Sequence, residues 1–253
     1  MGFFKSLFGL YTPEEVGQIG EEKIANKLDW LDLFGYRGKI LQNVYVPKGN
    51  GETTEIDIIY ITAKGLFVIE SKNYAGYIFG DEDSQQWTVT LYAGEDWLGR
   101  SKVDKYKFYN PIKQNLTHAR FLEKYLNRIV PMLSVIVFSD RAEIKKMSIH
   151  SPDVVVCTKA NLSRVIKDTW RGNPDVLSDE DIKSIYDCLR PLTNVDFATK
   201  QFHIESINNR INSMICPRCG GQLVLRTVKR GPNEGNQFYG CSNYPRCTFT
   251  RPF

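Results

Sequence analysis

The pattern of apolar and polar residues predicts a helix at the start of the chain. Apolar residues recur at helical spacing through residues 12–33, and Pro13 stands at the first turn, where proline suits a helix start. Glu21 lies three and seven residues before Ile24 and Leu28, so it shares their apolar face. A carboxylate on that face is a candidate functional group.

Further apolar runs predict a mixture of short strands and helices. A helix is expected at 110–128, with an apolar stripe that includes Ile112 and Leu116 and with Gln114 and His118 one turn apart on a neighbouring face. The other expected elements are strands near 36–46, 55–62, 65–72, 77–79, 87–91, 133–138 and 154–157 and helices at 161–167 and 178–190.

Two neighbouring strands of this pattern carry ionisable groups among apolar residues. Glu70 and Lys72 are two residues apart and therefore project from one face of their strand. If Ala63-Lys64 forms a two-residue loop, residues whose numbers sum to 127 face each other, and Asp57 lies opposite Glu70. A three-residue loop ending at Gly65 would shift this register by one.

Carboxylates brought together in this way require a cation. Asp57 and Glu70, and on some registers Glu55, outnumber the single Lys72. Oxygen ligands favour Mg²⁺ or Mn²⁺ over zinc, and such an ion supports hydrolysis of phosphodiesters. The alternative is a structural ion pair between Lys72 and a neighbouring glutamate.

Composition is that of an ordinary globular protein, but charge is unevenly distributed. The 253 residues are 42% hydrophobic and 25% charged, with a net charge of +4. Residues 216–253 contain one acidic residue, Glu234, against six basic ones, which favours a polyanionic partner for this end. The basic residues are Arg218, Arg226, Lys229, Arg230, Arg246 and Arg251.

No apolar run is long enough for a membrane span, so we expect a cytoplasmic protein without a membrane partner. Residues 1–12 are expected to form an apolar arm that docks on the fold. Gly2 with Ser6 also matches a myristoylation pattern, which leaves a membrane contact of this arm as the alternative.

Four cysteines in the basic segment have the spacing of a zinc site. Cys216 and Cys219 form one pair, and Cys241 and Cys247 form a second pair beyond a hairpin-like segment. Four thiolates suit a structural, tetrahedral Zn²⁺ whose binding drives folding of a segment poor in apolar residues. Two disulfides are the alternative, but nothing in the sequence indicates an oxidising compartment.

The two remaining cysteines lie in apolar surroundings. Cys157 follows three valines, and Cys188 lies on a predicted helix near Ile185 and Leu189. We therefore expect both to be small core residues.

Aromatic residues alternate with the basic residues of the cysteine segment. Such a combination stacks on bases while the cations follow the phosphates, although some rings must also pack the small zinc core. The expected DNA-binding residues are Arg218, Arg226, Lys229, Arg230, Phe238, Tyr239, Tyr244 and Arg246.

The segment from Cys216-Pro-Arg-Cys219 through Cys241-Ser-Asn-Tyr-Pro-Arg-Cys247 closely resembles the C-terminal zinc ribbons of type IA topoisomerases. The resemblance covers residues 214–250 and implies binding of DNA, often single-stranded. The chain is far too short to contain the catalytic body of a topoisomerase.

Residues 17–127 resemble the NERD domain, a nuclease-related member of the PD-(D/E)xK superfamily. The resemblance rests on Gly17-Gln-Ile-Gly20-Glu21, Glu55-Ile-Asp57, Gly65-Leu-Phe-Val-Ile-Glu70-Ser-Lys72 and Asn110-Pro-Ile-Lys-Gln114. It implies a restriction-endonuclease-like α/β fold, a mixed sheet flanked by helices. It also implies catalytic roles for Asp57, Glu70 and Lys72, with Glu21 and Gln114 in support. His118 stands where related nucleases often have tyrosine.

Together these signals predict a metal-dependent deoxyribonuclease with a DNA-binding zinc ribbon, acting in DNA repair or in defence against foreign DNA. Asp57, Glu70 and Glu21 are the expected Mg²⁺ or Mn²⁺ ligands. The alternative is a non-cleaving DNA-binding or adaptor protein with a degenerate nuclease fold. The expected domains are an arm at 1–12, a nuclease-like domain at 13–195, a linker at 196–213 and a ribbon at 214–253.

Overall fold

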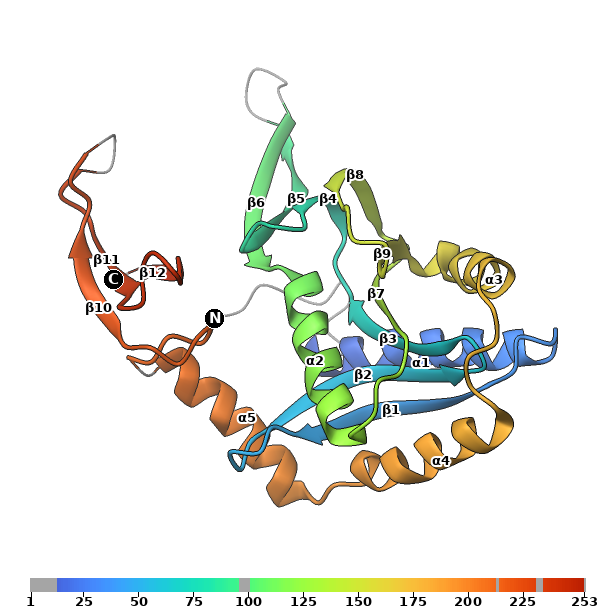
Figure 1. Ribbon diagram of the computed structural model, residues 1–253. Helices are drawn as coiled ribbons and strands as arrows, with labels where there is room; N and C mark the ends of the chain where they lie inside the picture. Colours follow the sequence, from blue (N-terminus) through green and yellow to red (C-terminus); the bar gives the residue numbers. More distant parts are fainter. Residues whose placement is uncertain (1–12, 96–100, 213, 231–233, 253) are drawn as a thin grey trace. The chain divides into compact units, whose positions relative to one another are not determined.

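A computed structural model describes residues 13–95, 101–212, 214–230 and 234–252 (Figure 1). The predicted arm and Thr12 lie outside the described residues. The helices are α1 (Pro13–Asp32), α2 (Pro111–Leu126), α3 (Leu162–Gly172), α4 (Asp179–Leu189) and α5 (Phe197–Asn212). The strands are β1 (Gly38–Pro47), β2 (Thr53–Thr62), β3 (Gly65–Lys72), β4 (Gly76–Asp81), β5 (Gln86–Glu95), β6 (Ser101–Tyr109), β7 (Met132–Phe138), β8 (Ala142–Ser148), β9 (Val154–Thr158), β10 (Leu223–Thr227), β11 (Gln237–Cys241) and β12 (Thr250–Pro252).

The chain divides after Val195 into two compact units, residues 1–195 and 196–253. The first unit contains a five-stranded mixed sheet in the order β1-β2-β3-β7-β9. Strands β1 to β3 are antiparallel, whereas β7 and β9 run parallel to β3. The predicted mixed sheet with flanking helices is confirmed.

The turn between β2 and β3 has the tighter of the two expected geometries. Thr62 pairs with Gly65 and Ile58 with Ile69, so the paired residue numbers sum to 127 and the loop is Ala63-Lys64. Gly65 has φ of +109°, and a Cβ there would lie 2.4 Å from the Pro131 carbonyl oxygen. A side chain is therefore excluded at this position.

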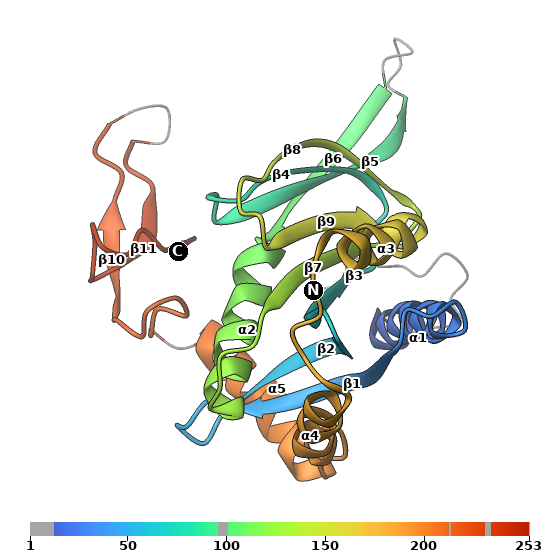
Figure 2. The same ribbon diagram turned by 45° about the vertical axis from the view of Figure 1, so that its right-hand side comes forward.

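Helices cover both faces of this sheet, α1 on one side and α2 on the other (Figure 2). Leu28 of α1 and Ile166 of α3 pack with the alternate residues Phe67 and Ile69 of β3. On the opposite face, Val68 packs with residues of α2 and α4. Neighbouring residues of β3 therefore point to opposite faces of the sheet, as the two-residue period of a strand predicts.

A second sheet, in the order β6-β5-β4-β8, continues from the first, because β4 follows β3 and β8 follows β7. Trp87, Ile78 and Val89 on its inner face pack against Ile136 and Phe138 of β7. Strands β6 and β8 were not predicted. Both alternate charged with apolar residues and so lack the apolar runs that marked the other strands.

Three helical expectations need correction. The buried face of α2 contains Asn115 and His118, whereas Leu116 is exposed, so the helix is rotated relative to the predicted apolar stripe. Helix α3 extends five residues beyond the predicted end at Lys167. Cys188 is exposed on α4, contrary to the expected core position, while Cys157 is buried as expected.

The second unit begins with α5, which occupies most of the segment expected to be a linker. Strands β10, β11 and β12 follow as a three-stranded antiparallel sheet. Its small core consists mainly of Leu223 and cysteine side chains, with Tyr239 and Phe249 packed against them. In neither unit does a described helix combine the length and apolar character needed to cross a membrane.

Candidate active site

Asp57 lies where β2 changes the face to which its side chains point. Ile58 packs on the α1 face and Ile59 on the α2 face, but Ile56 also packs on the α2 face, so the alternation breaks between residues 56 and 58. Across the pair, Asn43 of β1 has a left-handed φ of 52°. As a result, Asp57 has no ladder partner on β1 or on β3.

The Asp57 carboxylate reaches the end of β3. Its Oδ2 accepts a hydrogen bond from the Ser71 backbone N–H at 2.7 Å. The predicted register is confirmed, but the β2–β3 ladder ends at Ile58 and Ile69, one position before Asp57 and Glu70 would pair. Asp57 is thus adjacent to the Glu70–Lys72 segment without being a ladder partner of Glu70.

Glu70, Lys72 and Gln114 form a contiguous group between β3 and α2. Lys72 Nζ donates to Glu70 Oε1 at 2.6 Å and to Gln114 Oε1 at 3.2 Å. Glu70 is 2% exposed, which is rare for a carboxylate without a paired cation. The sheet therefore holds a buried carboxylate and a partly exposed ammonium on the face that α2 covers.

His118 and Thr54 extend this group. His118 Nδ1 lies 2.6 Å from Thr54 Oγ1, and its Nε2 lies 3.3 Å from Glu70 Oε2. Despite this proximity, Glu70 Oε2 and His118 Nε2 are buried atoms without a hydrogen-bond partner among the described residues. An unsatisfied buried oxygen of this kind calls for a further ligand.

Glu21 approaches the group from α1 and is half-buried. Burial, together with the negative charges of Glu55 and Glu70, raises the pKa of Glu21 to about 7. Burial and the Glu70 charge likewise raise the pKa of Asp57 well above its ordinary value. Three predicted ligands thus share a region with excess negative charge.

The pKa values of Glu70 and Lys72 reflect their pairing. Burial alone would raise the pKa of Glu70, but the Lys72 cation beside it brings that pKa below its ordinary value. Burial alone would lower the pKa of Lys72, but Glu70 and Asp57 raise it. At neutral pH the pair is therefore ionised.

A pocket of about 540 Å³ opens beside Lys72, between α1 and the carboxyl ends of β3 and β7. Its basic lining residues, besides Lys72, are Lys23, Arg141 and Lys159. Arg141 Nη2 donates to Asn73 Oδ1 at 3.0 Å, and Lys159 Nζ lies 3.2 Å from Asp140 Oδ2. The pocket therefore has the charge to receive an anion.

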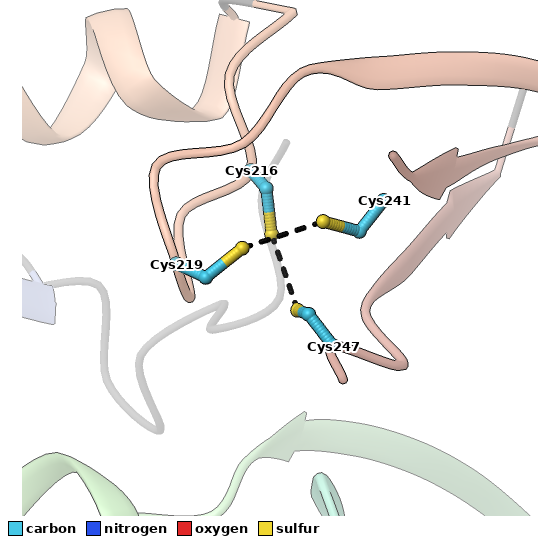
Figure 3. Close-up of side chains that lie close together, drawn as sticks. All are labelled: Cys216, Cys219, Cys241 and Cys247. Atoms are coloured by element: carbon cyan, nitrogen blue, oxygen red, sulfur yellow. Dashed lines mark hydrogen bonds between the residues drawn. The ribbon is translucent and has the colours of Figure 1, made fainter. Parts of the chain in front are cut away.

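The four predicted zinc ligands converge in the second unit (Figure 3). Their sulfur atoms all lie within 4.8 Å of one another. The Cys216 and Cys247 sulfurs are 3.7 Å apart and those of Cys219 and Cys241 are 3.3 Å apart, close to the edge of about 3.8 Å expected for tetrahedral Zn–S bonds of about 2.3 Å. All four cysteines are free, so the two-disulfide alternative is not adopted.

Polar groups favour the thiolate of Cys219, whereas burial raises the pKa of Cys216 to about 12 and also raises that of Cys241. Asn243 donates from its backbone N–H to Cys241 Sγ and from Nδ2 to Cys219 Sγ, both at 3.4 Å. The Gly221 backbone N–H and the Asn243 amide lower the pKa of Cys219 to about 6. This set of sulfur donors suits a structural Zn²⁺.

The predicted DNA-binding residues of the ribbon divide into two groups. Arg226, Lys229, Phe238 and Tyr244 line one groove of about 650 Å³, with the Arg226 guanidinium 5.6 Å from the centre of the Tyr244 ring. The structure does not bring the others into this groove. Arg218, Arg230 and Arg246 are exposed elsewhere on the unit, and Tyr239 packs on the zinc core.

Among the described residues, no group of three or more Asp, Glu, His or Cys ligands other than the four cysteines lies within 4.8 Å of one another. The carboxylate oxygens of Asp57, Glu70 and Glu21 therefore do not all lie within this distance of one another. Thr54 and Asn115 are buried polar residues near this group that were not predicted from the sequence. Thr54 Oγ1 contacts His118 Nδ1, and Asn115 Nδ2 donates to the Val68 carbonyl and to Ser134 Oγ.

Comparison with known families confirms both resemblances. Residues 16–139 match the nuclease-related domain, NERD. Residues 213–253 match the topoisomerase DNA binding C4 zinc finger. No solved structure matches the chain.

Individual relatives match either most of this chain or only a short part of it. An uncharacterized protein of Bacillus anthracis is 28% identical over 79% of this chain and 87% of its own length. DNA topoisomerase 1 of Archaeoglobus fulgidus is 60% identical over 15% of this chain, and the match spans 5% of that enzyme. The uncharacterized Escherichia coli protein YrdD is 49% identical over 16% of this chain and 20% of its own length.

Proposed function

We propose that this protein is a divalent-metal-dependent nuclease that hydrolyses phosphodiester bonds in DNA, because its chain combines a nuclease-related domain with a C4 zinc finger. The observation that carries the proposal is the partly buried contact of Lys72 with the buried Glu70 and with Gln114, beside Asp57. A core packed for stability alone would gain little from such a group, because burying an ion pair costs desolvation energy.

The donor set fits Mg²⁺ or Mn²⁺. Asp57 and Glu70 supply carboxylate oxygens, and Glu70 Oε2 has no hydrogen-bond partner in the described part of the chain. Glu21 is close enough for the charges of Glu70 and Lys72 to affect its pKa, so it is the third candidate ligand. When bound, such an ion polarises a phosphoryl oxygen and generates hydroxide from water.

Lys72 acts as a cation in this proposal. Glu70 and Asp57 raise the pKa of Lys72, so we assign it a role as a charged ammonium and not as a general base. Its donors instead stabilise negative charge that develops on the scissile phosphate and orient the attacking water. Gln114 fixes the direction of the ammonium by accepting one of its hydrogen bonds.

The basic pocket beside Lys72 provides a place for the DNA backbone. Lys23, Arg141 and Lys159 line it, and cations at this position attract phosphates flanking the scissile bond. The zinc ribbon adds a second DNA contact through Arg226, Lys229, Phe238 and Tyr244. Topoisomerase relatives that share this ribbon support DNA as its partner.

The competing function is DNA binding without cleavage. The specific observation in its favour is that Asp57, Glu70 and Glu21 do not converge within ligand distance of one another. In that case the Lys72–Glu70 pair would be a structural remnant, and the ribbon would perform the function of the chain.

A cleavage assay tests the proposal. The full chain is incubated with single-stranded, linear and supercoiled DNA, with and without Mg²⁺ or Mn²⁺, beside Lys72→Ala. Lys183→Ala, which removes an exposed lysine on α4, is the matched control. Metal-dependent cleavage by the wild type and the control, but not by Lys72→Ala, supports the proposal. Absence of metal-dependent cleavage on every substrate, or equal cleavage by Lys72→Ala, refutes it and leaves the binding function.

A further inference from the structure

The outer face of the second sheet presents aromatic rings. Residues on this face alternate with those that pack inward, such as Ile78 and Trp87. Tyr77 and Phe79 of β4 and Tyr92 of β5 are 45%, 37% and 67% exposed. Large aromatic side chains gain free energy from burial, so three exposed rings on one sheet face indicate a binding surface.

Strand pairing places lysines around these rings. Phe79 lies in a row that runs from Lys146 on β8 through Phe79 and Thr88 to Lys107 on β6. The threonine between the ring and Lys107 is short, so it leaves the edge of the ring accessible.

A second row repeats the arrangement. It runs from Glu143 on β8 through Tyr77 and Thr90 to Lys105 on β6. Lys145 also belongs to this face, because its ammonium lies 4.6 Å from the centre of the Tyr77 ring.

Charge on this face favours a polyanion. Four lysines stand against the single Glu143 within the two rows and their β8 neighbours, and Glu143 forms an ion pair with Lys145. These lysines are Lys105, Lys107, Lys145 and Lys146. A protein partner that covered these rings would have to bury the lysines or pair them with acidic groups, whereas phosphates pair with them directly.

We infer that the outer face of sheet β6-β5-β4-β8 binds single-stranded nucleic acid, stacking bases on Tyr77, Phe79 and Tyr92 while Lys105, Lys107 and Lys146 contact phosphates. Tyr77 and Phe79 are two residues apart on one strand, so their rings stand about 7 Å apart and can each accept one base of an extended strand. Duplex DNA hides its base faces in the stack and cannot use the rings in this way.

This surface belongs to the same unit as Lys72 and lies near it along the chain. Strand β3 ends at Lys72 and β4 begins at Gly76, so Tyr77 lies at most about 18 Å from Lys72. The surface is distinct from the basic pocket and from the ribbon groove, and the inference does not depend on cleavage. If the domain cleaves DNA, the surface would hold the strand close to the catalytic group.

Binding is measured with the zinc-loaded full chain and a fluorescent oligo(dT) of about 16 nucleotides, without Mg²⁺ or Mn²⁺. The double variant Tyr77→Ala/Phe79→Ala should raise the Kd at least about fivefold, because each lost stacking contact weakens binding. Tyr77→Phe, which keeps the ring, should bind like the wild type. Tyr125→Ala, which removes an exposed tyrosine from α2, is the matched control and should also bind like the wild type.

Salt dependence tests the lysines separately. Lys105→Ala/Lys107→Ala should reduce the slope of log K against log salt by about 1.4, since each phosphate contact to a single strand contributes about 0.7. Lys183→Ala should leave the slope unchanged.

Crosslinking distinguishes this surface from the zinc ribbon. Oligo(dT) carrying 5-iodouracil should crosslink to Tyr77, Phe79 or Tyr92 in the wild-type chain. The inference is overturned if the adducts are confined to residues 214–252, or if the double variant and the lysine variant leave Kd and salt slope unchanged. The face would then be a surface for a protein partner.

Discussion

Lys72 Nζ joins Glu70 on its own strand to Gln114 on α2, at 2.6 and 3.2 Å. This ammonium is the single cation in direct contact with the buried Glu70 carboxylate among the described lysines and arginines. The position of the Lys72 ammonium therefore depends on both β3 and α2, whereas its charge state depends on Glu70 and Asp57.

Removing the amide partner should weaken catalysis without removing the cation. In Gln114→Ala, Lys72 keeps Glu70 but loses the acceptor that fixes its direction, so we expect kcat to fall roughly tenfold to a hundredfold, with a smaller effect on KM. Steady-state cleavage kinetics measure both. Gln114→Glu keeps an acceptor and should retain more activity than Gln114→Ala. If both variants cleave like the wild type, Gln114 has no positioning role.

Neutralising Asp57 should stabilise the metal-free protein. Its pKa is raised by burial and by Glu70, so the folded state disfavours the ionised form that predominates in the unfolded chain at neutral pH. Asp57→Asn removes this penalty and keeps an oxygen for the Ser71 N–H, and Tm should rise by about 2–4 °C. Thermal unfolding followed by circular dichroism at pH 7 without divalent cations measures the change. A fall in Tm would show that the carboxylate is stabilised where it lies.

Zinc should be required for folding of the ribbon. The small core of β10 to β12 consists largely of cysteine side chains, so loss of the ion removes most of what holds it together. We expect about one Zn²⁺ per chain by elemental analysis and loss of that ion in Cys247→Ser. Unchanged metal content in Cys247→Ser would contradict the four-cysteine site, and Cys188→Ser is the matched control.

Alkylation should distinguish the cysteines by exposure and pKa. Cys188 is exposed, whereas Cys157 is buried and its pKa is raised to about 12, so it carries almost no thiolate between pH 7 and pH 9. Iodoacetamide added to the zinc-loaded protein should modify Cys188 and leave Cys157 unmodified. Peptide mapping by mass spectrometry measures the labels. Labelling of Cys157 at pH 8 in the folded protein would refute its buried, neutral state.

The local sequence pattern was sufficient to predict the loop and register of the β2–β3 hairpin, but not the break in β2 at Asp57. The loop Ala63-Lys64 and its register follow from the positions of apolar residues and Gly65, because a slip by one would reverse every side chain. The break at Asp57 was not predictable, since it depends on the left-handed Asn43 on another strand.

The rest of the site depends on tertiary packing. His118 and Asn115 are buried because α2 turns these polar residues to the sheet, and nothing in the helical periodicity distinguishes that orientation from one that buries Leu116. The zinc ligands, in contrast, were predictable because the spacing of four cysteines in a short segment already implies their convergence.

Single-turnover cleavage of a fluorescent DNA strand at increasing Mn²⁺ measures whether Asp57 and Glu70 support metal-dependent hydrolysis. We expect a cleavage rate that rises and saturates with Mn²⁺ for the wild type and for Lys183→Ala. For folded Asp57→Asn we expect a rate lower by at least about a hundredfold. No Mn²⁺-dependent cleavage by the wild type, or the same Mn²⁺ dependence in Asp57→Asn, would contradict this role of the two carboxylates.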